Sequence, residues 1–359
     1  MSHKKINVFL GGFINYTNAQ NLNCLALAQH LDKEKFNCFA LELYSGQLES
    51  QKGKINGLRV FHCFKPGRIS LYLGFLWGIW HCDVAYLPKV ELWRFNRFLL
   101  NVLRKTSFST IEGILDQDNL DSAIEVLGDY QSVISSKKIF TKSFAITHFL
   151  GQYNYEHHKI TVDRHVLYLG CDTITFKNNV VKSGVLQKVI YIGRLKKRKG
   201  IYDFLKIAQH FPELTFYIFG DGEEKIAIEA FLLENNLVHI KLMGIANHET
   251  LATYLEEIDL HILPSRSEGF PKVTLETAMA GVPSMVFDDY GAQEWIKNGE
   301  NGWVVKSVDE MIALIKDINN NDQKLQNISK QAIKLATSFD WNVRVKNWEI
   351  ELEKLAGIK

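Results

Sequence analysis

The sequence has little cysteine, little net charge and no long apolar run, and each shortage excludes a class of protein. Its five cysteines are scattered singly, with no pair at CxxC spacing, so we expect reduced thiols rather than a disulfide framework or a zinc site. The longest apolar run, Ile69–Trp80, is far shorter than the roughly 20 residues that a membrane-spanning helix needs. A net charge of only +2, with no recognition motif, argues against nucleic acid binding.

What the sequence does contain is typical of a globular protein with two domains. The chain has 46% hydrophobic and 23% charged residues, and its 359 residues suit two domains of about 150–200 residues each. The first residues, MSHKKINVFLGG, run directly into a strand pattern and lack the cleavage region of a signal peptide. Together with the unpaired cysteines, this start predicts a cytoplasmic protein.

The first half of the sequence alternates strand-like and helical segments. A buried-strand pattern at Ile6–Leu10 is followed by Gly11-Gly12 and by a helix over about Asn18–Leu31, with Leu22 and Leu25 on its apolar face. Further strands are predicted at Cys38–Leu43, Arg59–Cys63, Val84–Leu87, Phe108–Glu112, Val133–Ile134 and Val166–Leu169. Such alternation indicates a parallel sheet with helices on both faces.

The second half repeats this alternation after a polar segment, KNNVVKSGVLQ, which predicts a linker. Strands are expected at Lys188–Ile192, Thr215–Phe219, Ile240–Leu242, Leu260–Leu263 and Ser284–Phe287, with helices at 200–210, 223–235, 249–256 and 273–280. Near the end, Trp341, Val345, Trp348, Leu352 and Leu355 recur at helical spacing.

The predicted fold class is α/β, with two Rossmann-like doubly wound domains that face a central cleft. The domains are residues 1–176 and 188–338, joined by a linker at 177–187. Residues 339–359 form a C-terminal helix that crosses back to the first domain. A cleft is expected because sheets of this type bind ligands at the carboxyl ends of their strands.

A strand, a glycine turn and a cluster of basic residues follow one another in YIGRLKKRKG, at 191–200. Arg194 and Lys199 stand at the mouth of a helix, and glycine there allows the close backbone approach that a diphosphate requires. The alternative is a solvated basic loop, since charge runs are common. The next strand ends in Phe219-Gly220-Asp221-Gly222-Glu223, a second glycine turn that by itself is a weak signal.

Two glutamates lie eight positions apart in the segment EGFPKVTLE. Glu268 precedes a helix and Glu276 lies on its second turn, so both carboxylates can accept hydrogen bonds from vicinal hydroxyls. Glycine and proline fix the loop, and the helix N-terminus favours an anionic diphosphate. Backbone N–H groups that can point into the cleft remain at Gly269, Phe270 and Lys272. The alternative is that both glutamates are surface acids.

The stretch Tyr191–Val305 resembles the donor domain of the family-four glycosyltransferases, retaining enzymes of the GT-B fold. The matching motifs are GRLKKRKG, FGDG, LMG at Leu242–Gly244, LPSRSEGFPKVTLETAMAGVP and GAQEWIKNGENGWVV. The resemblance implies that Arg194 and Lys199 hold the donor diphosphate, that Glu276 holds the ribose and that Glu268 contacts the transferred sugar. The peptide at Met243–Ile245 would border the nucleobase.

The first domain resembles the family less closely. Gly11-Gly12 stands where a glycine loop usually approaches the diphosphate, and YLGCD at Tyr168–Asp172 is similar to the family's strand and turn before the linker. Many members have a histidine where this chain has Glu112, which could still accept a hydrogen bond from the sugar. The predicted catalytic residues are Glu268 and Glu112. The predicted donor-binding set is Gly12, Arg194, Lys199, Gly244, Glu268, Gly269, Phe270, Lys272, Val273 and Glu276.

The resemblance also implies the reaction, transfer of a hexose or N-acetylhexosamine from a nucleotide sugar, most often UDP-linked, to a glycan or lipid-linked saccharide. A bacterial surface polysaccharide is the expected setting, and neither a metal nor another cofactor is expected. Retention can come from front-face attack or from a glycosyl intermediate. Alternative interpretations are a nucleotide-sugar epimerase or a phosphorylase of the same fold, or a non-catalytic GT-B subunit.

The segment Lys52–Lys105 is basic and aromatic, with ten basic residues against two acidic ones. It contains Trp77, Trp80 and Trp93, and aromatic and basic residues together favour the surface of an anionic membrane. We therefore consider a peripheral enzyme at the inner face of the cell membrane. The equal alternative is that Leu71–Trp80 is a core helix and the charges are solvated.

Overall fold

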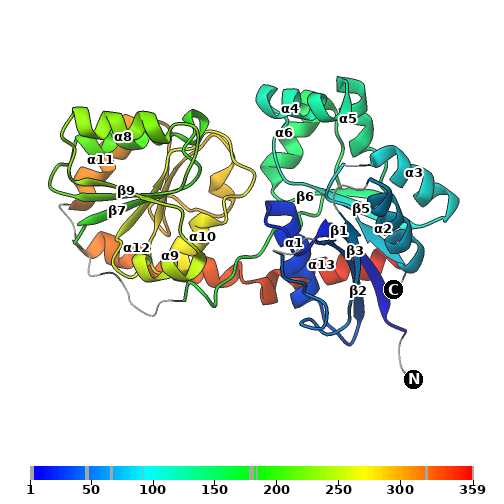
Figure 1. The fold of residues 1–359 in the computed structure, drawn as a ribbon. Helices are drawn as coiled ribbons and strands as arrows, with labels where there is room; N and C mark the ends of the chain where they lie inside the picture. Colours follow the sequence, from blue (N-terminus) through cyan, green and yellow to red (C-terminus); the bar gives the residue numbers. More distant parts are fainter. Residues whose placement is uncertain are drawn as a thin grey trace. The chain divides into compact units, whose positions relative to one another are not determined.

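The computed structural model describes residues 4–44, 48–64, 68–90, 92–177, 182, 185–319 and 322–357. The chain forms two compact units, the first made of Met1–Leu169 with Trp341–Lys359 and the second of Gly170–Asp340. Each unit contains a six-stranded sheet whose strands are all parallel (Figure 1). The predicted fold class of two doubly wound α/β domains with a C-terminal helix is thereby confirmed.

The first unit has its strands in the order β3-β2-β1-β4-β5-β6. The order reverses direction at β1, which pairs with both β2 and β4, and such a switch point is where doubly wound sheets bind ligands. Its elements are β1 (Ile6–Phe13), α1 (Ala19–His30), β2 (Phe36–Tyr44), β3 (Leu58–Phe64), α2 (Arg68–His81), β4 (Val84–Tyr86), α3 (Trp93–Val102), β5 (Thr106–Ile111), α4 (Gln117–Leu127), α5 (Tyr130–Lys137), β6 (Lys142–Ala145), α6 (His148–His158) and α13 (Trp341–Leu355).

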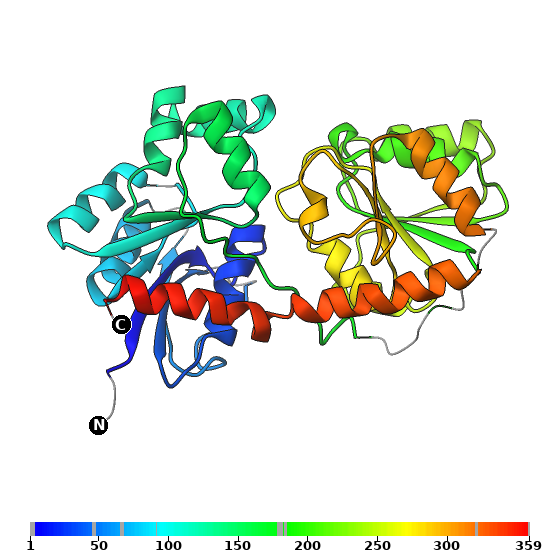
Figure 2. The same ribbon diagram turned by 180° about the vertical axis from the view of Figure 1, so that it is seen from behind.

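The core of the first unit lies on both sides of its sheet. Phe75 and Ile79 of α2 pack against Phe9 and Phe39 of the strands, and α2 lies so close that a Cβ on Gly78 would be 2.2 Å from the Phe9 ring. On the other side, α13 lies beside α1 (Figure 2). Its Trp348 is fully buried and donates from Nε1 to the carbonyl oxygen of Tyr168 at 3.1 Å.

Two predicted strands of the first unit are wrong. Val133 and Ile134 lie in α5, which begins after Asp129, whose side chain accepts a hydrogen bond from the Ser132 N–H at 2.7 Å. This N-cap outweighs the preference of two β-branched residues for strand. At Val166–Leu169 the backbone forms only a single bridge, Ala145↔Val166, and the sixth strand is instead the short β6.

The second unit has its strands in the order β12-β11-β10-β7-β8-β9, with the switch at β7 and β10. The predicted bounds of β7, β8, β10 and β11 agree with those observed. The elements are β7 (Lys188–Ile192), α7 (Ile201–Gln209), β8 (Thr215–Phe219), α8 (Lys225–Glu234), β9 (Ile240–Gly244), α9 (His248–Leu255), β10 (Leu260–Leu263), α10 (Val273–Met279), β11 (Ser284–Phe287), β12 (Trp303–Val305), α11 (Val308–Asn319) and α12 (Asp322–Ser338), with short 3-10 turns at Lys197–Lys199 and Ala292–Glu294.

Helices cover both faces of the second sheet (Figure 1). On one face α9, α10 and α12 share a buried cluster in which Ala278 meets Ala332 and Ala336, and small side chains allow α10 and α12 to pack closely. Most of the predicted linker at 177–187 lies outside the described residues. Within it, Lys182 is buried and donates to the carbonyl oxygens of Leu255 at 2.7 Å and Glu256 at 2.8 Å, which caps the end of α9.

Two further predictions concern cysteines and hydropathy. All five cysteines are unpaired and buried. Among the helices of the described ranges, none combines the length and the apolar character that crossing a membrane requires.

Leu22, assigned to the apolar face of α1, is instead 40% exposed, because the buried face of that helix is formed largely by Asn21, Cys24, Leu27 and Ala28.

Candidate functional site

A pocket of about 510 Å³ opens in the second unit where β7, β8 and β9 end. Its wall includes Arg194 and Lys196 after β7, the turn Gly220–Gly222 after β8, and Ile245 after β9. The glycine turns come together closely: Gly220 donates to the Gly244 carbonyl at 2.8 Å, and a Cβ on Gly220 would be 1.8 Å from the Gly193 carbonyl oxygen. Only glycine fits there, so the second glycine turn is required by this approach.

The wall also has an apolar part. Ile245 is 79% exposed at the end of β9, and Phe219, Ala246 and Leu251 complete this side of the pocket. Gly244, the last residue of β9, has φ +75°, a conformation that favours glycine. An apolar surface beside glycine turns and cations suits a planar ring joined to an anionic group.

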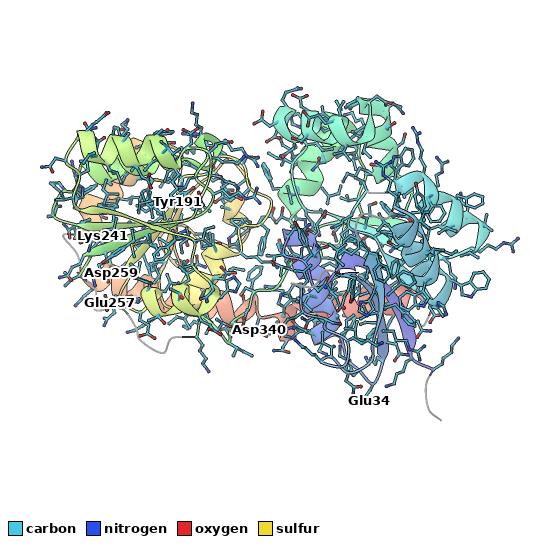
Figure 3. All side chains as sticks on the ribbon, viewed as in Figure 1. Glu34, Tyr191, Lys241, Glu257, Asp259 and Asp340 are labelled. Atoms are coloured by element: carbon cyan, nitrogen blue, oxygen red, sulfur yellow. The ribbon has the colours of Figure 1, made fainter. Side chains whose placement is uncertain are left out.

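The basic loop after β7 is anchored from inside the unit. The hydroxyl of Tyr191, within the second unit in Figure 3, donates to the carbonyl oxygen of Arg194 at 2.9 Å and lies 3.4 Å from that of Lys199. Gly200 follows with φ +74°, and a Cβ there would be 1.8 Å from the Pro264 carbonyl oxygen. Burial, and then the charge of Glu268, raise the pKa of Tyr191, so the hydroxyl keeps its proton. Sequence reasoning did not identify Tyr191, which looks like one more apolar strand residue.

Lys199 and Glu268 form an ion pair. The Nζ atom of Lys199 lies 2.5 Å from Oε1 of Glu268, and the two side chains are only 18% and 12% exposed. The sequence assigned these residues to two different parts of a donor, and the structure places them in contact. An ammonium has three donors, so Lys199 can keep this partner and still bind an anion.

The loop from Pro264 to Pro271 is held by packing. Phe270 is 9% exposed and its ring lies 4.9 Å from that of Trp295 and 5.6 Å from that of Phe339, centre to centre. Its side chain is therefore a core residue, and a ligand could meet only its backbone. The Thr274 hydroxyl donates to the Pro271 carbonyl at 2.8 Å, which ties the loop to the start of α10.

Glu276 lies in the first turn of α10 rather than the predicted second, because it is the fourth residue of a helix that begins at Val273. Its side chain is half-buried. Burial raises the pKa of Glu276, while the charges of His248 and Lys272 lower it and that of Asp172 raises it further. Lys272 and Val273 begin the helix, and both are half-buried. His248, at the start of α9, was not singled out by the sequence because no motif surrounds it.

In the first unit, Glu112 follows directly after β5 and is held by three neutral donors. Its Oε1 accepts from the Thr110 hydroxyl at 2.8 Å and the Tyr86 hydroxyl at 3.0 Å, and its Oε2 accepts from Nδ2 of Asn23 at 2.9 Å. Burial and the neighbouring Glu112 charge raise the pKa of Tyr86, which keeps that donor protonated. The sequence identified Glu112, but not its partners on α1 and β4.

Gly12 does not lie in a loop after the first strand, as predicted, but within β1. The pairing with β2 shifts register between Leu10 and Phe13, so the strand continues past an irregularity at the glycines. A Cβ on Gly12 would be 2.8 Å from Sγ of Cys24, which shows that α1 approaches here. A packing requirement therefore accounts for this glycine, and its role in donor binding stays a prediction.

The histidines near the end of the first unit have structural partners. Nδ1 of His157 is 2.9 Å from the Tyr153 carbonyl oxygen, and Nε2 of His158 is 2.7 Å from that of Leu115. His165 lies 3.3 Å from Asp163. Within the ranges that the structure describes, no three His, Cys, Asp or Glu side chains are grouped to hold a metal ion.

Comparison with known proteins gives matches in sequence and in fold. Residues 173–335 match the family model of the glycosyl transferases group 1, a range that lies within the second unit. An uncharacterized glycosyltransferase of Methanocaldococcus jannaschii is 26% identical over 174 residues, which are 45% of this chain and 49% of the relative. Poly(glycerol-phosphate) alpha-glucosyltransferase of Bacillus subtilis is 27% identical over 183 residues, 48% of this chain and 26% of that protein. The matched region thus spans half or less of these curated relatives.

A solved structure resembles the whole chain in fold. The Anabaena protein HepE, crystallised in complex with UDP, has a TM-score of 0.79 to this chain at 16% identity, and the match covers 97% of this chain and 100% of that one. The order of strands and helices described above is therefore shared beyond the range of the sequence match.

Proposed function

We propose that this chain, whose second unit belongs to the glycosyl transferases group 1, is a retaining GT-B glycosyltransferase that uses a nucleotide sugar. The observation that carries the proposal is that Arg194, Lys196 and the glycine turn Gly220–Gly222 line one pocket of the second unit. Lys199, on the same basic loop as Arg194, forms an ion pair with Glu268. The fold alone would not require these charged groups, because the same fold is found in proteins of many different functions.

The donor is proposed to occupy the second unit. The base would lie against Ile245, Ala246 and Leu251, with the diphosphate at Arg194 and Lys199. Glu276 would accept hydrogen bonds from the ribose hydroxyls, and Glu268 from the transferred sugar. UDP is the proposed nucleotide, supported by the UDP complex of the Anabaena protein. A hexose or N-acetylhexosamine is the proposed sugar.

The charges suit the bond that breaks. Cleavage of a sugar–phosphate bond leaves positive character on the sugar and negative charge on the leaving diphosphate. Arg194 and Lys199 would stabilise that negative charge, and each preorganised donor of this kind is often worth about 3–4 kcal/mol. Glu268, already paired with Lys199, would place its second oxygen for a sugar hydroxyl.

We propose front-face attack, in which the leaving phosphate oxygen accepts the acceptor's proton. This choice is supported by the state of Glu112, whose two oxygens accept three hydrogen bonds. A carboxylate engaged in this way is a weak nucleophile, because attack would require it to release its donors. Glu112 would instead accept a hydrogen bond from a sugar hydroxyl.

The acceptor is proposed to be a glycan or lipid-linked saccharide of a bacterial surface polysaccharide, reached at an anionic membrane. The described residues of the segment Lys52–Lys105, which exclude 65–67 and 91, support the proposed contact with an anionic membrane. Helix α2 buries Phe75 and Ile79 but leaves Trp80 61% exposed, and α3 leaves Phe98 61% exposed with Arg94 and Arg97 also at the surface. One face of α2 is thus part of the core, and its exposed face is the one that we propose to meet the membrane.

A panel of UDP-, GDP- and ADP-sugars incubated with the purified chain tests the proposal. Release of a nucleoside diphosphate from one donor, increased by a saccharide acceptor, is the expected result. Conversion of the donor's sugar without release would indicate an epimerase. No calorimetric binding of any nucleoside diphosphate would favour the non-catalytic subunit and contradict the proposal.

A further inference from the structure

A separate pocket of about 320 Å³ lies in the first unit, and the residues that line it all belong to that unit. Its walls come from the segment Thr110–Leu115, which begins with the last two residues of β5, and from Gln20 of α1, Asn119 of α4, Lys137 of α5 and Asn154 of α6. Five separate elements therefore direct polar side chains to one hollow. Glu112 lies on its wall, which places the pocket next to a residue assigned to the reaction.

Lys137 is the cation of this pocket. It is the last residue of α5, and its side chain is half-buried. Burial lowers the pKa of Lys137, and the charge of Glu112 opposes that shift. Among the described residues, its ammonium has neither a hydrogen-bond acceptor nor an ion-pair partner. A partly buried cation without a partner is unfavourable unless water or a ligand supplies an oxygen.

The neighbouring polar groups do not supply that oxygen. Glu112 is held by Asn23, Tyr86 and Thr110, and its charge is dispersed over their three hydrogen bonds. The amide of Asn154 donates to the Gly113 carbonyl at 3.2 Å and accepts from the Leu115 N–H at 3.2 Å. These contacts hold the wall in shape and leave Lys137 as the cation that faces the hollow.

Two amides on the same wall still present carbonyl oxygens. Gln20 uses its NH₂ group on the Pro88 carbonyl at 2.9 Å, and Asn119 uses its own on that of Ile114 at 3.0 Å. Their side-chain oxygens can accept hydrogen bonds from hydroxyls. A cation beside two such acceptors is complementary to a sugar that has both hydroxyl groups and an anionic substituent.

We propose that this pocket binds a saccharide acceptor through an anionic substituent, a carboxylate or a phosphate, and that Lys137 selects for that charge. The inference rests on the proposed transferase function and names the class of its acceptor. Lys137 acts as a specificity-determining residue, since it would contact the anion rather than the bond that forms.

Three matched ligands test the charge requirement: p-nitrophenyl glucoside, its glucuronide and its 6-phosphate. They share the ring and differ at C6, and their dissociation constants are measured by titration calorimetry on the full chain saturated with UDP. We expect the glucuronide or the 6-phosphate to bind at least tenfold more tightly than the neutral glucoside. The stronger of the two identifies whether carboxylate or phosphate is the natural group.

Two lysine variants test whether Lys137 causes the preference for the anionic ligand. Lys137→Met removes the charge at similar length and should weaken binding of the anionic ligand about tenfold or more, while binding of the glucoside changes less than threefold. Lys138→Met changes the exposed residue that directly follows α5 and should leave all three constants unchanged. Thermal unfolding of both variants establishes that each is folded.

Equal binding of charged and neutral ligands to the wild type would overturn the proposal, as would equal weakening of all three ligands by Lys137→Met. Binding of UDP and release of UDP from a donor sugar are measured in parallel. Because these depend on the second unit, their loss in the wild type would count against the transferase function, whereas their retention without charge selection counts against Lys137 alone.

Discussion

The two units share a doubly wound parallel sheet but hold their candidate functional glutamates in opposite ways. In the second unit Glu268 is paired with a cation, Lys199, at 2.5 Å. In the first unit Glu112 is held by three neutral donors, and the nearby Lys137 has no hydrogen-bond acceptor or ion-pair partner for its ammonium within the part of the chain that the structure describes. In an ion pair, the lysine can exchange the carboxylate for an arriving anion and so release it, whereas a carboxylate held by neutral donors is fixed in place. The neutral network of the first unit therefore suits the orientation of a ligand, and the ion pair of the second unit suits the binding of a charged group.

The largest expected effect comes from removing the carboxylate of the ion pair. Glu268→Ala should lower turnover at least 100-fold, because the sugar loses a contact and Lys199 loses its partner. Nucleoside diphosphate release is the measurement. The matched control is Glu257→Ala: Glu257, labelled in Figure 3, also lies 2.5 Å from a lysine, Lys188, but is 71% exposed. Turnover of Glu268→Ala at the wild-type rate would remove Glu268 from the site.

Removal of the neutral network should act mainly on stability. Glu112→Ala leaves Asn23, Tyr86 and Thr110 without their acceptor, and we expect a loss of about 2–3 kcal/mol in the free energy of unfolding. Urea denaturation followed by fluorescence measures it, with Glu125→Ala on the exposed side of α4 as the control. Glu112→Gln keeps an acceptor and should lose less. A Glu112→Ala variant as stable as the wild type would show that the neutral hydrogen bonds of Glu112 do not stabilise the first unit, and it would contradict the contrast drawn between the two glutamates.

A smaller effect is expected from the anchor of the cationic loop. Tyr191→Phe removes the hydroxyl that bonds to the Arg194 carbonyl, so UDP affinity should fall about three- to tenfold and stability by about 1 kcal/mol. Calorimetric titration with UDP measures the first change. Tyr202→Phe, which removes a surface hydroxyl bonded to Glu224, should leave UDP affinity intact. If both variants bind UDP like the wild type, Tyr191 serves only the core.

The smallest expected effect is on vesicle binding by the exposed aromatic side chains of α2 and α3. Vesicles with anionic lipid should sediment with the protein at low salt and lose it at high salt. Trp80→Ser with Phe98→Ser should reduce this binding several-fold. The control is Ile226→Ser with Leu233→Ser on α8, where apolar side chains are equally exposed but the neighbouring residues Glu223, Glu224 and Glu229 are acidic. Absence of binding at low salt would contradict the membrane proposal.

The second unit was the easier one to predict, because its functional residues lie in contiguous motifs. Arg194, Lys199 and Glu268 each stand next to a glycine, and Glu276 follows them in the helix that begins after Pro271. The glycines and the proline also determine the local backbone. Its strands are short continuous apolar runs, which the sequence displays directly. The pairing of Lys199 with Glu268 was not predictable, since the two residues are 69 positions apart and only the tertiary fold brings them together.

The first unit was harder because its site is assembled from single residues on many elements. Asn23, Tyr86 and Lys137 have no motif around them and look like ordinary members of α1, β4 and α5. The two β-branched residues Val133–Ile134 favour a strand by intrinsic preference, and the Asp129 cap overrides that preference; β6 is too short to give a periodic signal. Gly12 was read as a loop residue although the need for close packing at Cys24 also selects glycine.

The packing of α13 on the first unit affects how the chain is made. Trp348 fills the space beside Tyr86 and Phe108, with ring centres 5.5 Å and 6.3 Å away, so the core of the first unit is complete only when the last helix has been synthesised. The second unit is inserted between the two parts and has all its residues earlier. On the ribosome, the first unit therefore cannot complete its core until α13 has been synthesised, after the whole of the second unit.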